Sequence, residues 1–398
     1  MLRLRDAGPP RPPDSLYVHV PFCRDRCTYC AFPTVRDRPE RHAALVSALR
    51  ARAAASSFPA PLTTLYLGGG TPALLAPELL RQLLDGIREH VIFDPKIEIT
   101  LEANPANITA DALAAWAALG VTRVSVGVQT FADESLRRLA RLHDADDARC
   151  ALRLLATTWR STWSADLLVG LAGQTSRDLL ADVDELLGYS PPHVSVYGLT
   201  IEPRTPLAAL AREGRAVTAP AHLAPDFDAA WSTRLCHAGL ERYEVSNFAR
   251  PGQRSRHNQA YWSNASYLGL GPGAASSIPP FRWVEREEPE AWMAAAHARR
   301  GVRRAVERLS PGQRLLESVW LGLRTCDGVD VVELDRRFGG GWRERVLPAA
   351  RALLDADVLH LDRRLRLRPA DLPRADAVGQ QLAAACLAED LPVADGAP

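Results

Sequence analysis

Residues 16–32 read LYVHVPFCRDRCTYCAF, an apolar stretch followed directly by Cys23, Cys27 and Cys30. The alternating apolar residues of 16–20 are typical of a β-strand, so the three thiols are expected on the loop after it. Zinc sites usually combine two cysteine pairs into four ligands. The other cysteines are single and scattered, namely Cys150, Cys236, Cys326 and Cys386. We interpret those four as buried core residues. Three thiolates and an open position instead fit a [4Fe–4S] cluster with one iron lacking a protein ligand.

The composition limits the class of protein. The 398 residues exceed the roughly 250–300 at which one core usually divides, so two domains are expected. A net charge of +1 gives no reason to expect nucleic-acid binding. Seven cysteines without a secretory signal fit a reducing compartment, and the absence of an apolar run of about 18 residues argues against a membrane span. We therefore predict a cytoplasmic protein that is not an integral membrane protein.

Short apolar runs alternate with helical patterns over the first 245 residues. The predicted strands are 16–20, 63–68, 97–102, 123–128, 164–170, 193–199 and 242–246. The clearest predicted helices are 41–55, 77–90, 109–120 and 176–188. This alternation predicts parallel βαβ units and an α/β fold, a complete or partial (β/α) barrel.

The rest of the chain changes character. We predict a flexible lead at 1–14, the barrel at 15–245, an irregular extension at 246–300, a small winged-helix-like domain at 301–386 and a tail at 387–398. Helical patterns at 314–324 and 343–357 precede VLHLDRRLRLRP (358–369), which alternates as a hairpin does. The arginine-rich run ARRGVRRAVER (298–308) is interpreted as a solvated helical face. GLGPGA (269–274) fits a dinucleotide fingerprint, but the prolines after it exclude the required helix.

Polar and glycine residues stand where the predicted strands end. In a (β/α) barrel these ends meet at one face, where ligands bind. The glycines of YLGGGTP (66–72) would expose backbone N–H and C=O groups to a ligand. Glu102 could accept a hydrogen bond from a ribose hydroxyl or an amine, and the guanidinium of Arg141 suits a carboxylate. Gln129 and Asp166 complete the face.

Taken together, these motifs resemble the radical S-adenosylmethionine (SAM) superfamily and, within it, the HemN/HemW group related to anaerobic coproporphyrinogen III oxidase. The resemblance rests on LYVHVPFC, LGGGTP, LEANP, GVQTF, DLLVGLAGQT, YEVSNFARPG, HNQAYW and LGLGPGAAS, in the family's order. It implies a cluster whose open iron binds SAM and whose electron cleaves SAM to a 5′-deoxyadenosyl radical. It also implies that Tyr17, Gly69 and Glu102 contact this SAM. Six further residues match positions that hold a second SAM in the oxidase: Tyr29, Gly70, Thr71, Gln129, Arg141 and Asp166.

Two departures from the oxidase pattern favour the HemW branch, which consists of haem chaperones. The oxidase motif resembles C-x3-C-x2-C-x-C, whereas this chain has Phe32 at the last position. The oxidase also carries a long N-terminal extension, whereas the lead predicted here covers residues 1–14. The resemblance therefore implies haem as a ligand and a respiratory, membrane-associated protein as its acceptor. An oxygen-independent coproporphyrinogen III oxidase is the alternative.

The motif HNQAYW supplies a candidate haem ligand. His257 lies beside Tyr261 and Trp262, whose rings could flank a macrocycle, and haem iron commonly takes a histidine. A histidine that only satisfies local backbone groups is the alternative. Ala275 stands where the family motif G-A-H-S carries a histidine, so a side-chain ligand at that position is lost.

Overall fold

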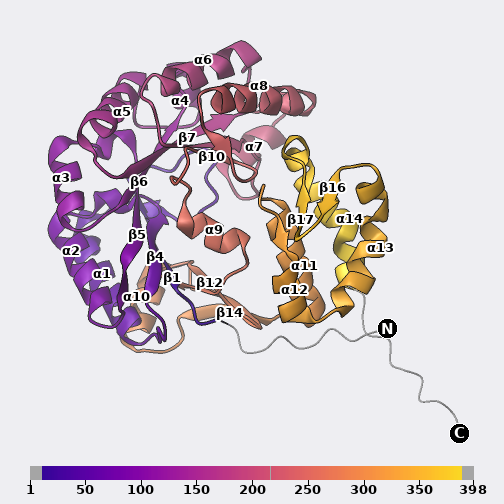
Figure 1. Ribbon diagram of the computed structural model, residues 1–398. Helices are drawn as coiled ribbons and strands as arrows, with labels where there is room; N and C mark the ends of the chain where they lie inside the picture. The colour runs from indigo at the N-terminus through magenta and orange to yellow at the C-terminus, as the bar shows by residue number, and fades with distance from the viewer. Residues whose placement is uncertain (1–10, 216, 388–398) are drawn as a thin grey trace, which may run out of the picture.

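The central feature of the computed structural model is one strongly curved sheet; the structure describes residues 11–215 and 217–387 (Figure 1). Twelve strands within these residues follow the order β14-β13-β12-β11-β1-β4-β5-β6-β7-β8-β10-β9. The predicted lead and tail lie mostly outside the described residues. Asp14 is described, and its carbonyl accepts a hydrogen bond of 2.7 Å from the N–H of Thr63. The end of the lead is thus fixed against the sheet.

Six neighbouring parallel strands form the middle of this sheet, and they confirm six of the predicted strands. They are β1 (Ser15–Val20), β4 (Leu62–Gly69), β5 (Phe93–Ala103), β6 (Arg123–Gln129), β7 (Thr162–Val169) and β8 (His193–Gly198). In β1, Leu16, Val18 and Val20 are fully buried, while the alternate residues Tyr17 and His19 line an inner cavity. One strand face thus builds the core and the other builds a site.

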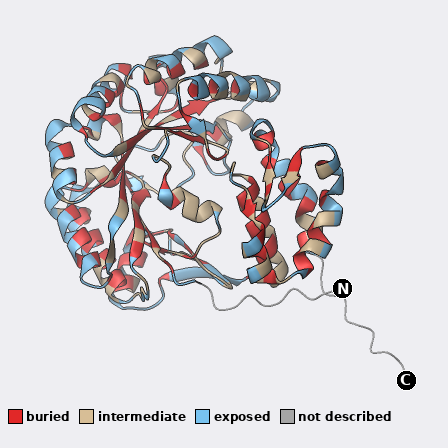
Figure 2. Ribbon diagram, viewed as in Figure 1, coloured by how far each residue is buried: buried red, intermediate tan, exposed pale blue. Residues whose placement is uncertain are grey.

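Helices cover the outer face of the curved sheet (Figure 1). They are α1 (Pro39–Ala54), α2 (Pro77–Arg88), α3 (Ala110–Ala118), α5 (Ala145–Thr158), α6 (Ser176–Leu187) and α8 (Ala224–His237). The short helices α4 (Asp133–Arg138) and α7 (Pro206–Arg212) instead contact the cysteine loop, through hydrogen bonds with Thr28. Figure 2 shows buried residues on their sheet-facing sides and exposed residues outside. Shorter elements follow strands or precede helices: β2 (Phe22–Cys23), β3 (Val35–Arg36), η1 (Pro72–Leu74), η2 (Pro105–Asn107) and η3 (Ala221–Leu223). The four predicted helices are confirmed.

The barrel is partial, because the edge strands β14 and β9 are not paired with each other in the described sheet. Antiparallel strands extend it at both ends. The predicted strand 242–246 is wrong: β9 (Glu241–Arg242) and β10 (Asn247–Ala249) are separate strands. The reason is a turn between them, in which carbonyls of 244 and 245 accept hydrogen bonds from the Arg242 guanidinium.

The sequence predicts an irregular segment at 246–300, but the structure differs. This segment contributes strands to the sheet and side chains to its core. It contains α9 (Arg256–Trp262), β11 (Tyr267–Leu270), β12 (Ala275–Ile278), β13 (Phe281–Glu285) and α10 (Pro289–His297). β11 is parallel to β1, and no helix follows it, so the exclusion of a dinucleotide fold is confirmed. Each of these strands is only four or five residues long, which leaves little sequence periodicity to detect.

The arginine-rich run is also corrected. Its end is β14 (Arg303–Arg308), an exposed strand that pairs with β13, not a helical face. Gly301, at φ +70, comes between α10 and this strand. A residue in that left-handed region interrupts the helix, and Arg303 then stacks over the ring of Trp283 at 4.3 Å.

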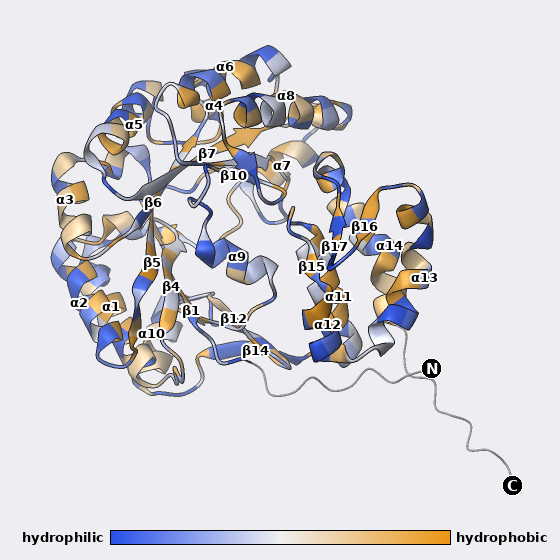
Figure 3. Ribbon diagram, in the orientation of Figure 1, coloured by the Kyte–Doolittle hydropathy of each residue, from blue (hydrophilic) through white to orange (hydrophobic). Residues whose placement is uncertain are grey.

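The remaining elements form a smaller unit with its own core around Leu315, Phe338, Trp342 and Leu365. They are α11 (Pro311–Leu323), β15 (Val329–Asp330), α12 (Val331–Phe338), α13 (Gly341–Asp355), β16 (Leu359–Leu361), β17 (Arg364–Leu367), η4 (Pro369–Arg374) and α14 (Ala375–Leu387). The antiparallel pair β16–β17 confirms the predicted hairpin. Figure 3 shows apolar residues on the facing sides of these helices. Helices followed by a hairpin agree with the predicted winged-helix-like arrangement.

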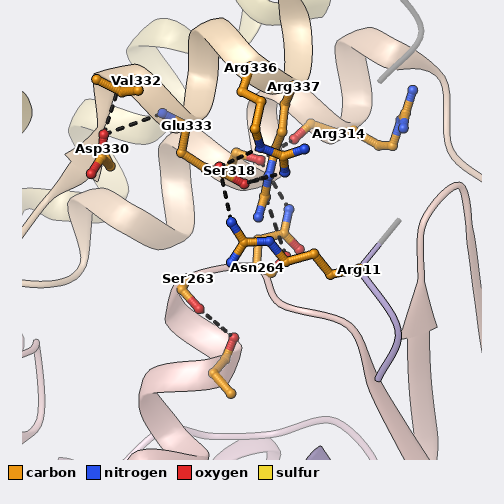
Figure 4. Close-up of polar contacts among 11 residues, drawn as sticks. Arg11, Ser263, Asn264, Arg314, Ser318, Asp330, Val332, Glu333, Arg336 and Arg337 are labelled. Carbon is orange, nitrogen blue, oxygen red and sulfur yellow. Dashed lines mark hydrogen bonds and ion pairs between the residues drawn. The ribbon is translucent and has the colours of Figure 1, made fainter. Parts of the chain in front are cut away.

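Polar contacts join this unit to the barrel around Glu333 of α12 (Figure 4). Glu333 lies 3.6 Å from Arg11 and 2.7 Å from Arg337. Arg337 donates to the carbonyl of Asn264 at 3.4 Å, and the Asn264 amide donates to Ser318 Oγ at 3.2 Å. These contacts hold α11 opposite α9.

Candidate functional site

The three cysteines of the first loop line one cavity of about 430 Å³ at the open face of the barrel. Cys23 ends β2, and the N–H of Cys30 donates to the carbonyl of Cys27 at 3.3 Å, which closes a turn. The N–H of Thr28 donates to the carbonyl of Leu139, so the loop is anchored beyond β6. All three thiols are free and partly exposed. The local fold therefore presents three sulfur ligands to one space.

The surroundings of these sulfurs suit thiolates. Burial raises the pKa of Cys23 to about 11 and also raises that of Cys30, so metal binding must displace protons there. The Arg141 guanidinium lies 3.4 Å from Cys27 Sγ, and the Thr71 hydroxyl lies 3.8 Å from Cys23 Sγ. Both groups donate toward sulfur and favour the charged form.

No group of three or more His, Cys, Asp or Glu side chains in the described chain is placed to hold a single metal ion. A [4Fe–4S] cluster makes a different demand, because its thiolates bind separate iron atoms. The three thiols around one cavity fit that demand, whereas they do not form a closed zinc site.

Of the other four cysteines, only Cys386 is buried, in the smaller core. Cys150 and Cys236 are exposed on α5 and α8, so the prediction that they are core residues is wrong. Cys326 is half-buried. None of the four lines the cavity that holds the cysteine loop.

The glycine segment at the end of β4 passes very close to neighbouring groups. A Cβ on Gly69, whose φ is +106, would lie 2.3 Å from the His19 ring, and one on Gly70 would lie 2.5 Å from the carbonyl oxygen of Phe22. Larger residues would therefore displace β1 or the cysteine loop. The N–H of Gly70 also donates to the carbonyl of Val20 at 2.8 Å. The segment holds strand and loop together.

Glu102, at the end of β5, lies inside the barrel. Its Oε1 accepts a hydrogen bond of 2.7 Å from the Tyr66 hydroxyl, and its Oε2 accepts one of 3.0 Å from the N–H of Gly69. Burial raises its pKa to about 7, and the nearby charge of Asp166 adds to that shift. The carboxyl group therefore changes charge near neutral pH.

Arg141 and Gln129 come from the segment around the end of β6. Arg141 donates to Asn104 Oδ1 at 2.6 Å and to the carbonyl of Gly127 at 2.8 Å. The Asn104 amide in turn donates to the Thr71 hydroxyl at 3.1 Å. Gln129 has a φ of +72, an uncommon conformation that is enriched at functional sites.

Asp166 on β7 faces the same cavity. Its carboxylate accepts hydrogen bonds of 3.3 and 3.4 Å from the Ser125 hydroxyl. Burial raises its pKa to about 6. Tyr29 also lines this cavity, so every predicted SAM residue except Tyr17 lies around it.

A second cavity of about 720 Å³ adjoins the first. It shares Phe32, Tyr66, Gly69, Glu102 and Asn258 with the first cavity. Aromatic side chains from the barrel dominate its wall: Tyr17, Tyr66, Tyr261, Trp262 and Tyr267. The opposite wall comes from α11, through Leu316, Trp320 and Leu321. Its size falls within the range of about 300–1,000 Å³ typical of small-molecule sites.

His257 lies in the wall of this second cavity, but neither ring nitrogen is available for a ligand. Nδ1 is 2.8 Å from the Thr64 hydroxyl, and Nε2 is 2.9 Å from the Tyr261 hydroxyl. The residue is 1% exposed, and burial lowers its pKa to about 3. His257 is thus held by two side-chain hydroxyls, and not by local backbone groups as the alternative interpretation had it.

Sequence reasoning missed three residues that the structure makes central. Tyr66 and Asn104 stand inside the quoted motifs YLGGGTP and LEANP, so their position was a usable signal. Trp320 lies on α11 in the smaller unit, and no local pattern connects it with the barrel. Ala275 lies in β12 on the wall of the second cavity and offers no polar side-chain atom.

Comparison with known proteins agrees with this fold. The Radical SAM superfamily matches residues 17–186, and the HemN C-terminal domain matches residues 309–371. The solved structure of coproporphyrinogen III oxidase (HemN) from Escherichia coli aligns with a TM-score of 0.82 over 94% of this chain and 91% of that one, at 21% identity. Fold and site thus define a protein of the radical SAM class with a HemN-like C-terminal domain.

Closer sequence relatives narrow the class. Heme chaperone HemW of a Synechocystis strain is 35% identical over 338 residues, 81% of this chain and 80% of the relative. Heme chaperone HemW of Mycobacterium tuberculosis is 36% identical over 350 residues, 84% of this chain and 87% of the relative. A mitochondrial mouse protein, radical S-adenosyl methionine domain-containing protein 1, is 34% identical over 82% of this chain and 78% of its own. The chain belongs to the HemW family.

Membership in the radical SAM superfamily implies a [4Fe–4S] cluster and SAM as cofactors. The three thiols on one cavity fit such a cluster. No helix of the described residues is long and apolar enough to cross a membrane.

Proposed function

We propose that this chain is a haem chaperone that binds haem and passes it to an acceptor protein. Cys23, Cys27 and Cys30 hold a [4Fe–4S] cluster whose fourth iron is left open for SAM. The observation that carries this proposal is the pair of adjoining cavities, one with the three thiols and one walled by aromatic rings. When bound, the cluster supplies one-electron chemistry at its open iron.

The predicted SAM residues have distinct roles in this proposal. Tyr17, Gly69 and Glu102 hold the SAM on the cluster: the ionised carboxylate accepts from a ribose hydroxyl, and the glycine allows close approach. Arg141, already facing Cys27, offers charge to a SAM carboxylate. A second SAM is assigned to Tyr29, Gly70, Thr71, Gln129, Arg141 and Asp166.

Haem is assigned to the second cavity. The rings of Tyr261, Tyr267 and Trp320 offer apolar faces to a macrocycle, and α11 covers it from the other side. His257 is not assigned as the iron ligand, because both ring nitrogens serve the fold. The methyl group of Ala275 adds apolar wall.

The cellular setting is also part of the proposal. The relatives named as heme chaperones support the haem-binding part of the proposal. We further infer delivery of haem in the cytoplasm to a respiratory, membrane-associated acceptor, as the family resemblance implies. The similarity to HemN shows a shared fold, whereas Phe32 replaces the additional cysteine of the oxidase motif.

The test is an anaerobic reconstitution of the cluster followed by two assays. Haem titration is expected to give one haem per chain, and SAM, a reductant and coproporphyrinogen III are expected to give no protoporphyrinogen. Leu316→Asp places a charge in the wall of the haem cavity and should weaken haem binding by about tenfold or more. Val332→Asp, on an exposed residue of the same unit, is the matched control. Decarboxylated product, or haem binding unchanged in Leu316→Asp, would overturn the proposal.

A further inference from the structure

The end of the first cavity opposite the cysteines is lined by residues near the beginnings of β6, β7 and β8. Ser125 pairs in register with Ser164, and Ser164 pairs with His193, so the three side chains form a row across neighbouring strands. Arg123 starts β6 beside this row. Asn258 of α9 lines the same space, and Figure 1 shows α9 inside the curve of the sheet.

His193 has an unused ring nitrogen in this space. The residue is 1% exposed, and its Nδ1 has no hydrogen-bond partner. Its Nε2 is 2.8 Å from the Tyr243 hydroxyl, which also accepts from the N–H of Ser255 at 3.4 Å. Within the described residues Nε2 is the only acceptor recorded for the phenolic hydrogen, so Tyr243 donates to it. The hydrogen of the neutral ring is then on Nδ1, as a buried donor without an acceptor.

Arg123 adds a positive charge to the same end of the cavity. It is 3% exposed, and its recorded hydrogen bond runs from Nη1 to the carbonyl of Gln253 at 3.3 Å. Among the described residues Arg123 forms no ion pair with a carboxylate, although Asp166 is near enough to feel its charge. A buried charge without a counterion is unfavourable, so buried guanidinium groups are usually paired.

The nearest acid does not serve as that partner. Burial raises the pKa of Asp166 and Tyr243 and lowers that of His193, and the charge of Arg123 acts in the lowering direction on all three, so the guanidinium lies near these groups. Asp166 accepts from Ser125, and the Ser164 hydroxyl donates to Ser125 at 2.9 Å, so the serine hydroxyls are directed toward Asp166. Arg123 and His193 therefore keep donors for a ligand.

We propose that the inner end of the first cavity is a carboxylate-binding subsite, in which the Arg123 guanidinium and the Nδ1–H of His193 hold one carboxylate. A planar guanidinium matches a carboxylate in two-point geometry. One positive group and one neutral donor, with Asp166 on the far side, suit a monoanion and disfavour a dianion such as phosphate. Asp166 also keeps the subsite selective, because it repels additional negative charge.

Two ligands of the proposed function carry such a group: the methionyl carboxylate of a SAM molecule and the propionates of haem. The inference rests on the proposed function for the identity of the ligand, but the subsite itself can be tested without either one.

The first experiment uses the full chain with its cluster reconstituted and sodium propionate as the probe. Isothermal titration at constant ionic strength should give a dissociation constant on the order of 1 mM for propionate and none for propionamide, its neutral isostere. Arg123→Gln should weaken propionate binding by about tenfold or more, whereas Arg137→Gln, on an exposed arginine outside the cavity, should not. Equal binding of propionate and propionamide, or retention of propionate by a folded Arg123→Gln, would overturn the subsite.

If Arg123→Gln does not fold, the comparison of propionate with propionamide in the parent protein is sufficient to test the subsite. His193→Asn supplies a further arm, and it too should weaken propionate. Two further comparisons identify the source of the carboxylate. In the parent and in Arg123→Gln, the affinity for SAM is compared with that for decarboxylated SAM, and the affinity for haem with that for its dimethyl ester. The natural occupant is the acid whose tighter binding, relative to its neutral analogue, disappears in Arg123→Gln. If both acids keep their tighter binding in the variant, the assignment is overturned.

Discussion

The hydroxyl of Thr64 lies 2.8 Å from Nδ1 of His257, so a residue of β4 fixes the imidazole ring in the first turn of α9. With Tyr261 on Nε2, this contact ties α9 to the inner face of the sheet. The histidine of HNQAYW therefore builds the wall of the second cavity, and both of its ring nitrogens are occupied.

His257→Gln should therefore reduce stability more than haem affinity. An amide can replace only part of the two hydrogen bonds, so a loss of about 1–3 kcal/mol in the free energy of unfolding is expected at pH 7. Haem affinity should stay within about threefold, as measured by absorbance titration. A folded variant that no longer binds haem would show that His257 turns toward iron when haem is bound.

The stability difference between these two proteins should depend on pH. Burial lowers the pKa of His257 from 6.5 to about 3, so the neutral ring favours the folded state above pH 6.5 and this advantage is lost as the pH falls toward 3. The gap between the parent and His257→Gln should therefore narrow between pH 6.5 and pH 5 in urea unfolding. A gap independent of pH would contradict the buried, neutral ring.

Substitution of each loop cysteine should remove the cluster. Cys23→Ser, Cys27→Ser and Cys30→Ser each leave two thiolates, which should lower the iron and sulfide bound after anaerobic reconstitution by at least about fivefold. Cys150→Ser and Cys236→Ser are matched controls, because both residues are exposed and outside the cavity. Equal iron loss in the controls would contradict the assignment.

SAM affinity should rise with pH around neutrality. Burial raises the pKa of Glu102 from 4.5 to about 7, so the carboxyl group loses its proton as the pH passes 7 and then accepts better from a ribose hydroxyl. Titration of SAM at pH 6.5 and pH 8 should show tighter binding at pH 8, and Glu102→Gln should abolish the difference.

The same raised pKa of Glu102 opposes folding above pH 7, so Glu102→Gln should gain stability relative to the parent as the pH rises from 4.5 to 7.

The ion pair between Arg52 of α1 and Glu285 of β13 should stabilise the added strands. Arg52 Nε lies 2.8 Å from Glu285 Oε1, and Trp292 donates to Oε2 at 2.7 Å, all in the core. Arg52→Met leaves this carboxylate buried without its cation and should cost about 3–5 kcal/mol. Arg50→Met, in the same helix as Arg52, removes an exposed ion pair with Glu89 and should cost less than about 1 kcal/mol. Similar losses in urea unfolding would contradict the role of the buried pair.

The sequence contained most of the barrel but less of the second cavity. Strands such as β1 and β6 are apolar at alternate positions, and their ends carry residues of the first cavity, so periodicity and motif order suffice. The strands β11 to β13 are too short for a period, and the alternation at 242–246 hid a turn stabilised by Arg242. Trp320 reaches the site only through tertiary packing, and the bonded state of His257 depends on Thr64, a residue 193 positions away.

Both cavities are lined by Tyr66, Gly69 and Glu102. Glu102 accepts hydrogen bonds from the Tyr66 hydroxyl and from the N–H of Gly69. A ligand that draws either oxygen of Glu102 toward one side changes what the other side presents. In the proposed function, thermodynamic reciprocity requires that whatever SAM does to the affinity for haem, haem does equally to the affinity for SAM. That proposal therefore couples haem loading and SAM occupancy through a single carboxylate.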